Sequence, residues 1–117
     1  LSAFLIKRKV LQGVHITSFL HSEIVEIAKR IPGIERSIVM AAMPIHFETL
    51  FRDSGTQEVS LFRGYLNETI TKRLRDRGIR VRAYPVNWPE EAKRFASWGV
   101  DAIFTDNPAR MQSFRKL

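Results

Sequence analysis

The hydrophobic positions along the chain follow two alternating patterns. Short runs of apolar and β-branched residues are each followed by a stretch in which apolar residues recur every three or four positions. The short runs predict strands, and the longer spacing predicts amphipathic helices. The predicted strands are 14–19, 37–42, 58–62, 79–86 and 101–105, and the predicted helices after them are 22–31, 46–51, 67–77, 88–98 and 107–114.

Residues with known preferences for helix ends support these boundaries. Ser22 and Asn67 are predicted N-caps, and Gly78 stands where a left-handed residue would end a helix. The run Asn87-Trp-Pro-Glu-Glu91 places a proline and two acids in a first helical turn. A loop is predicted at 53–55, and the end of a further helix at 1–11.

The strict alternation of strands and helices predicts an α/β fold with parallel strands joined by right-handed crossovers. Two architectures fit this order, an open doubly wound sheet and a TIM barrel. No G-x-G-x-x-G or G-x-x-x-x-G-K-[ST] motif occurs, so a nucleotide-binding sheet has no local support. In both architectures the functional groups gather at the carboxyl ends of the strands.

The composition narrows the class of protein further. Hydrophobic residues make up 44% and charged residues 26%, which is typical of a globular chain. The absence of cysteine excludes a disulfide scaffold and thiol catalysis. No apolar run reaches the roughly 18 residues of a membrane span. We expect no membrane span and no signal peptide, and we slightly favour the cytoplasm. Because the chain starts without Met, within a predicted helix, we expect it to be part of a longer protein.

The positive charge is concentrated in one segment. The net charge is +7, and the stretch 72–82 holds six basic residues and one acid, hence +5 of that total. One basic segment spread over a helix and the next strand is more typical of a solvated helix face than of a nucleic-acid footprint. We therefore predict no nucleic-acid partner.

The histidines offer no catalytic pattern of their own. His15, His21 and His46 each lack a second histidine or a carboxylate at ligand spacing, so each is predicted to be a surface or packing residue. No Ser-His-Asp order and no paired carboxylates stand out. Read on its own residues, the chain offers binding groups and no catalytic machinery.

Several strand ends together resemble the glycerophosphodiester phosphodiesterase family. The matching elements are Ser18-Phe19, Gly78-Ile-Arg-Val-Arg-Ala-Tyr-Pro-Val-Asn87, the helix start after it, and Gly99-Val-Asp-Ala-Ile-Phe-Thr-Asp-Asn-Pro108. The resemblance extends from Gly13 to about Met111. Two departures stand out: Tyr84-Pro85 replaces the Trp-Thr of the family, and Ala102 replaces a glycine.

The resemblance implies that residues 1–117 are the C-terminal part of a TIM barrel, about five βα units, without the N-terminal catalytic portion. It implies that the complete protein hydrolyses glycerophosphodiesters to an alcohol and glycerol 3-phosphate. Two histidines and a divalent metal ion, Mg or Ca, would serve the reaction. The family's His-Arg-Gly, Glu-x-Asp, His-Asp and Glu-x-Lys elements do not occur here and would precede Leu1. We therefore expect no catalytic residue and no metal ligand in this stretch, and no activity of the chain alone.

The candidate substrate-binding residues lie at or near the strand ends, and they are Phe19, Tyr84, Ser18, Arg82, Asn87 and Asp106. Tyr84 would stack on, or hydrogen-bond to, the glycerol or alcohol portion. Arg82 shares the strand face of Tyr84, and we favour a structural ion pair with Glu58 or Asp101 over a phosphate contact.

The remaining candidates serve the walls and loops of the pocket. Phe19 is predicted to form the pocket wall, on the opposite strand face from Ser18. Asn87 and Asp106 are expected to fix loops by capping helices more than to touch substrate. Phe62 and Tyr65 would lie at the pocket rim.

Two readings from other classes stay open. The chain could be a non-catalytic half-barrel that binds a partner or associates with itself through its open edges. It could also be a basic nucleic-acid-binding domain, which we favour less. The sequence before Leu1 would discriminate between these readings, because the family's catalytic motifs would lie there.

Overall fold

The computed structural model describes residues 14–112. The strands are β1 (His15–Ser18), β2 (Glu35–Met40), β3 (Glu58–Phe62), β4 (Arg80–Tyr84) and β5 (Ala102–Ile103). The helices are α2 (His21–Arg30), α3 (Phe47–Ser54), α4 (Glu68–Asp76) and α5 (Pro89–Trp98), with a 3-10 turn η1 (Arg63–Tyr65) after β3. The helix predicted at 1–11 lies outside the described residues, and the last predicted helix is described only to 112, where it begins as turns.

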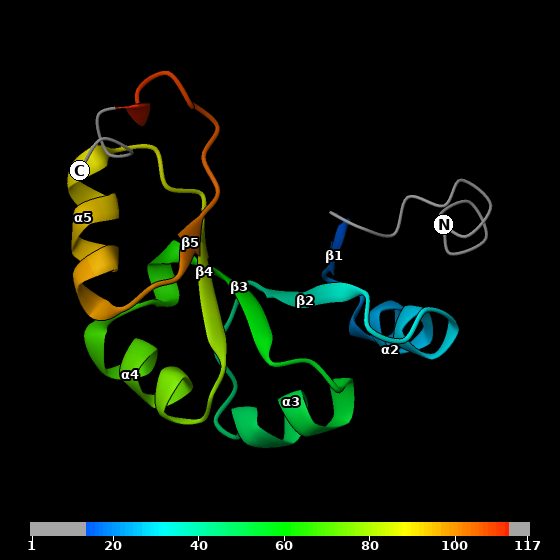
Figure 1. Cartoon of the computed structure of the whole chain (residues 1–117). Helices are drawn as coiled ribbons and strands as arrows, with labels where there is room; N and C mark the ends of the chain where they lie inside the picture. Colours follow the sequence, from blue (N-terminus) through cyan, green and yellow to red (C-terminus); the bar gives the residue numbers. More distant parts are fainter. Residues whose placement is uncertain (1–13, 113–117) are drawn as a thin grey trace.

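The strand order decides between the two candidate architectures. All five strands are parallel and lie in the order β1-β2-β3-β4-β5, each next to its neighbour in the sequence. A doubly wound sheet would reverse its order at a switch point. Right-handed crossovers that always advance in one direction instead place every helix on the same face. Figure 1 shows α2 to α5 along the outside of the curved sheet, so the fold is part of a βα barrel.

The outer face of the sheet forms the hydrophobic core with these helices. Ile38, Val59, Leu61 and Val81 of β2, β3 and β4 are no more than 1% exposed. They belong to one cluster with side chains from α2, α3, α4 and α5, whose members include Ile24, Phe47, Leu74 and Phe95. This burial leaves the alternate residues of each strand on the inner, concave face.

Three predicted helix ends are confirmed and two are wrong. Asn67 Oδ1 accepts a hydrogen bond from the Ile70 amide at 2.7 Å, which makes Asn67 the N-cap of α4. The left-handed Gly78 follows α4, and Pro89 opens α5. Ser22 does not cap α2, because that helix already begins at His21. Residues 53 and 54 are helical and not loop, since α3 continues until Gly55 ends it with a φ of 68°.

Candidate active site

The inner face of the sheet carries polar side chains in the middle of the strands and aromatic side chains at their carboxyl ends. Glu58, Ser60 and Phe62 of β3 pair in register with Arg80, Arg82 and Tyr84 of β4. Along β3 the side chains are therefore a carboxylate, a hydroxyl group and an aromatic ring. Along β4 they are two guanidinium groups and an aromatic ring. This gradient places a charged network beneath an aromatic hollow.

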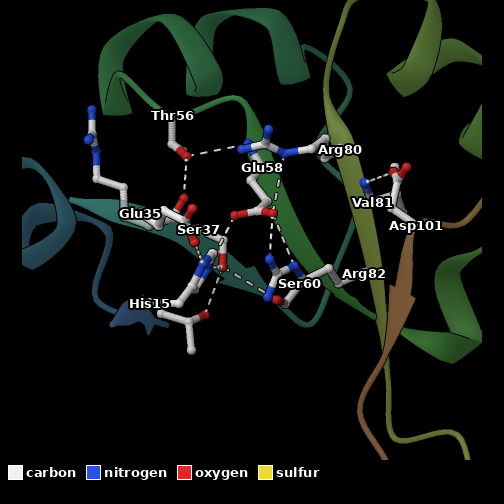
Figure 2. A network of polar contacts seen from close by, with 12 residues as sticks. His15, Glu35, Ser37, Thr56, Glu58, Ser60, Arg80, Val81, Arg82 and Asp101 are labelled. Carbon is white, nitrogen blue, oxygen red and sulfur yellow. Dashed lines mark hydrogen bonds and ion pairs between the residues drawn. The ribbon is translucent and has the colours of Figure 1, made fainter. Parts of the chain in front are cut away.

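The charged network is built around Glu58, which is only 3% exposed (Figure 2). Arg82 reaches Glu58 Oε1 with Nη2 at 2.7 Å and Nε at 3.1 Å, and Arg80 Nε lies 3.4 Å from the same oxygen. The predicted Arg82–Glu58 ion pair is thus confirmed. The alternative partner, Asp101, instead binds Arg75 at 2.6 Å and the amide of Val81 at 2.8 Å.

His15 belongs to this network, so the prediction of an isolated histidine is wrong for it. Its Nε2 lies 3.1 Å from Glu58 Oε2 and 3.3 Å from Ser37 Oγ. Glu58 stands 43 positions later in the sequence, and the two side chains meet on the inner face because β1 and β3 flank β2. His21 binds the Val39 carbonyl at 2.9 Å, which agrees with a packing role.

A layer of hydroxyl groups separates the charged network from the aromatic hollow. Ser37 Oγ donates to Thr17 Oγ1 at 3.1 Å and lies 3.5 Å from Ser60 Oγ. Thr17 and Ser60 also line the hollow above. These hydroxyl groups are therefore available to a polar ligand as well as to their neighbours.

The hollow at the carboxyl ends of the strands has a volume of about 280 Å³. Its walls are mainly aromatic and apolar, and its lining residues are Thr17, Phe19, Val39, Ser60, Tyr84, Pro85, Phe104, Thr105 and Asp106. The Tyr84 ring meets Phe19 edge-on at 6.1 Å and Phe62 at 5.9 Å between ring centroids, and Phe62 in turn meets Tyr65. These edge-to-face contacts join the rings into one aromatic wall.

The hydroxyl group of Tyr84 is not directed into open solvent. It donates a hydrogen bond to the Met40 carbonyl at the end of β2, at 2.9 Å. Desolvation by burial raises the pKa of Tyr84 above its ordinary value of 10.0. The hydroxyl group is therefore protonated at neutral pH, and the ring is the part of Tyr84 that is left to a ligand.

Asn87 and Asp106 fix the loops, but not by capping helices as predicted. Asn87 Oδ1 accepts hydrogen bonds from Thr105 Oγ1 at 2.9 Å and from the Asp106 amide at 2.8 Å. Its Nδ2 lies 3.4 Å from Asp106 Oδ2. The N-cap position of α5 is Trp88, which makes no side-chain cap bond. The side chain of Asn87 thus joins the loop after β4 to the loop after β5.

The structure brings together only some of the candidate residues. Phe19, Tyr84 and Asp106 line the same hollow, and Asn87 supports it. Ser18 faces a different hollow, and its Oγ accepts a hydrogen bond from the Leu20 amide. Arg82 lies below, with Glu58.

Six lining residues of the hollow were not among the candidates, and Thr17, Ser60 and Phe104 are three of them. Thr17 stands two positions before Phe19, and Ser60 two before Phe62, so the alternation of strand residues could have indicated both. Phe104 follows β5 directly and could have been found as an apolar residue at a strand end.

No cation site can be assembled from the part of the chain that the structure describes. Residues 14–112 contain no group of three or more histidine, aspartate or glutamate side chains arranged to hold a metal ion. Asp106 brings one carboxylate to the hollow, and Glu58 is engaged by two arginines and His15. Within the same residues, no helix has the length and apolar character that crossing a membrane requires.

Sequential parallel strands, helices on one face and a hollow at the strand carboxyl ends define this chain as part of a βα-barrel domain. Proteins with this barrel fold have many different functions, so the family has to be identified from the sequence. The chain belongs to the glycerophosphoryl diester phosphodiesterase family, whose sequence profile matches residues 12–110.

Comparison with known proteins gives a sequence relative, solved structures of the same fold, and the share of each protein that this chain covers. The chain is 29% identical over 106 residues to the uncharacterized protein YqiK of Bacillus subtilis, covering 88% of this chain and 43% of that protein. A phosphodiesterase of Oleispira antarctica, solved with its product sn-glycerol-3-phosphate, is 20% identical with a TM-score of 0.89. The match covers 99% of this chain and 48% of that one.

A glycerophosphodiester phosphodiesterase of Parabacteroides distasonis is 21% identical, with a TM-score of 0.78 over 96% of this chain and 47% of that one. The chain therefore spans about half the length of the proteins that it matches. The predicted resemblance to the family and the partial-barrel fold are both confirmed.

Proposed function

We propose that the complete protein hydrolyses glycerophosphodiesters to an alcohol and glycerol 3-phosphate, and that this chain supplies the C-terminal wall of its catalytic barrel. The family membership of residues 12–110 is the observation that carries the proposal. A similar structure was solved with sn-glycerol-3-phosphate, which supports a substrate of this size. The hollow at the strand ends supports the same assignment, because barrel enzymes place their sites there.

In this proposal the chain binds and orients the substrate. The rings of Tyr84 and Phe19 would contact the carbon skeleton of the glycerol or alcohol portion, and the hydroxyl groups of Thr17 and Ser60 would bond to its oxygens. Asn87 would hold the two loops at the mouth in place. No histidine lines this hollow within residues 14–112, so the acid and base would come from the rest of the protein.

The complete protein would also use a divalent metal ion, Mg or Ca, bound by residues outside this chain. A cation offsets the charge of a phosphodiester, which otherwise repels nucleophiles. The described residues do not provide a ligand set of their own. Treatment of the complete protein with a chelator should abolish hydrolysis, and added Mg or Ca should restore it. Unchanged activity after chelation would refute this part of the proposal.

The chain alone should be inactive, because the residues needed for proton transfer lie elsewhere. The test compares the chain with the complete protein in hydrolysis of glycerophosphocholine with excess Mg or Ca. We expect turnover only from the complete protein. Turnover by the chain alone, well above a blank with metal only, would place the catalytic groups within these 117 residues. No turnover by the complete protein would refute the proposed reaction.

The structure gives the basic segment internal partners, which weighs against the nucleic-acid reading. Five of its six cations form ion pairs, and those other than Arg80 are Lys72 with Asp76, Arg75 with Asp101, Arg77 with Glu48 and Arg82 with Glu58. Arg80 also approaches Glu58, and Arg73 lies over the Phe47 ring. The complete protein should therefore bind DNA or RNA no more tightly than micromolar at physiological salt.

A further inference from the structure

A second hollow, of about 430 Å³, opens beside the first at the end of β2. The two hollows share Phe19 and Val39, so the Phe19 ring stands between them. The second hollow is bounded by residues 39–44, by His21 of α2 and by Leu50 of α3. It thus extends from the candidate substrate site over the end of β2 toward two of the outer helices.

The wall of the second hollow is largely apolar, and two of its backbone acceptors already have partners. The end of a strand normally exposes carbonyl oxygens that a polar ligand or water could use. Here the Val39 carbonyl accepts a hydrogen bond from His21 Nε2, and the Met40 carbonyl accepts one from the Tyr84 hydroxyl group, both at 2.9 Å. The side chains that remain on its walls include Phe19, Met43 and Leu50. A polar head group would find few partners here, whereas a hydrocarbon chain would lose none.

The mouth of the site is apolar as well. Within residues 14–112, every large hydrophobic side chain that is exposed follows the carboxyl end of a strand, and these side chains are Phe19, Leu20, Ile45, Tyr65, Trp88 and Phe104. The carboxyl ends of parallel strands lie at one end of a barrel. Apolar side chains gathered around a binding site indicate a ligand that is itself partly apolar.

We propose that the second hollow holds the hydrocarbon chain of a single-chain glycerophosphodiester, of the kind found in lysophospholipids. The inference rests on the proposed function, because the polar glycerophosphate part would occupy the first hollow. Phe19 and Val39 line both hollows, so the two hollows are adjacent, and a ligand that extends past Phe19 would occupy both. The complete protein would then prefer diesters with an apolar chain over glycerophosphocholine.

The test is a series of 1-acyl-glycerophosphocholines with acyl chains of increasing length, all used below the concentration at which they form micelles. Each buried methylene group should raise kcat/KM of the complete protein about fourfold until the hollow is filled, after which the values should level off. A parallel series with the alkyl chain on the leaving alcohol shows which end of the diester the hollow accepts. No dependence on chain length in either series would overturn the inference, whereas turnover of glycerophosphocholine would still support the proposed reaction.

Ala42→Gln places a polar group on the wall of the second hollow, and Ala96→Gln makes the same change at an exposed position of α5 that lines neither hollow. We expect Ala42→Gln to lower the ratio of kcat/KM for the long-chain diester to kcat/KM for glycerophosphocholine at least fivefold. Ala96→Gln should leave this ratio unchanged. Equal ratios in both variants and the unmodified protein would overturn the inference.

A binding measurement separates the inference from the proposed reaction. 1-O-Alkyl-glycerol 3-phosphates carry the chain but no diester bond, so their binding does not require turnover. Calorimetry on the complete protein should give Kd values that fall about fourfold per methylene group and then level off, with Ala42→Gln weakening only the longer ligands. If these Kd values do not change with chain length, the second hollow is not a chain-binding site, whether or not the protein is active.

Discussion

Tyr84 shows how one side chain can serve both the fold and the site. Its hydroxyl group joins β4 to the end of β2 through Met40, while its ring contacts Phe19 and Phe62 in the hollow. In the complete protein, Tyr84→Phe should lower the free energy of unfolding by about 0.5–1.5 kcal/mol and change kcat/KM little, because only the hydrogen bond is lost. Because desolvation raises the pKa of Tyr84 in the folded state, the free energy of unfolding is unaffected by this group below pH 10.0 and falls as the pH rises from there through the folded-state pKa.

Tyr84→Leu removes the ring and should lower kcat/KM about 5- to 150-fold, mainly through KM, because a contact made to bound substrate stabilises ground and transition states alike. Steady-state kinetics and urea denaturation of the same complete proteins separate the two effects. Tyr65→Phe, at a neighbouring exposed ring, is the control and should change neither quantity. Unchanged kinetics in Tyr84→Leu would remove Tyr84 from the substrate site.

Glu58 is the second residue whose role depends on its partners. Its carboxylate is 3% exposed and balances Arg80 and Arg82 inside the barrel. Glu58→Gln should destabilise the complete protein by roughly 1.5–3 kcal/mol, because it weakens the charge-assisted hydrogen bonds of Arg82, whose side chain is 24% exposed. Glu35→Gln, whose side chain is 75% exposed, should change stability by less than about 1 kcal/mol. Equal denaturation midpoints for the two variants would show that the network contributes no such stabilisation.

The elements differ in whether their ends depend on the local sequence or on neighbouring segments. Asn67 caps α4 through its own side chain, whereas Ser22 lies inside α2 and caps nothing. Asn67→Ala should therefore cost about 1 kcal/mol of stability. Ser22→Ala, which removes the same kind of group from an exposed position, should stay within about 0.5 kcal/mol. Thermal denaturation of both variants tests this difference, and a larger loss from Ser22→Ala would contradict the assigned start of α2.

At the scale of the whole molecule, the sheet formed within residues 14–112 has two open edges, β1 and β5, and an inner face built for a closed barrel. Five strands do not close a barrel, and open edges promote association. The isolated chain should therefore associate with itself, while addition of the remaining part of the barrel should give a one-to-one complex that hydrolyses glycerophosphocholine. Sedimentation measures the first outcome and a coupled assay the second. A stable 13.5 kDa monomer at all concentrations would contradict the expected association.

Local patterns in the sequence determined the elements and the end of the sheet at which the site lies. The strand at 58–62 agrees with β3 residue for residue, and the cap at Asn67 is correct, because alternation and capping involve neighbours in the sequence. The family resemblance identified Phe19 and Tyr84, and both line the hollow. The position of the site at the strand ends could be predicted without the family resemblance, because both α/β architectures place functional groups there.

Tertiary structure decided every contact between residues from different strands. Alternation indicated that Arg82 faces inward, but strand order decided that Glu58 and not Asp101 is its partner. His15 was predicted to be isolated because Glu58 is distant in sequence. The two side chains meet because β1 and β3 pair with the two edges of β2. Asn87 likewise binds Thr105 and Asp106 instead of capping its own helix. Partner choice depends on register and strand order, which arise only when the helices pack on one face of the sheet.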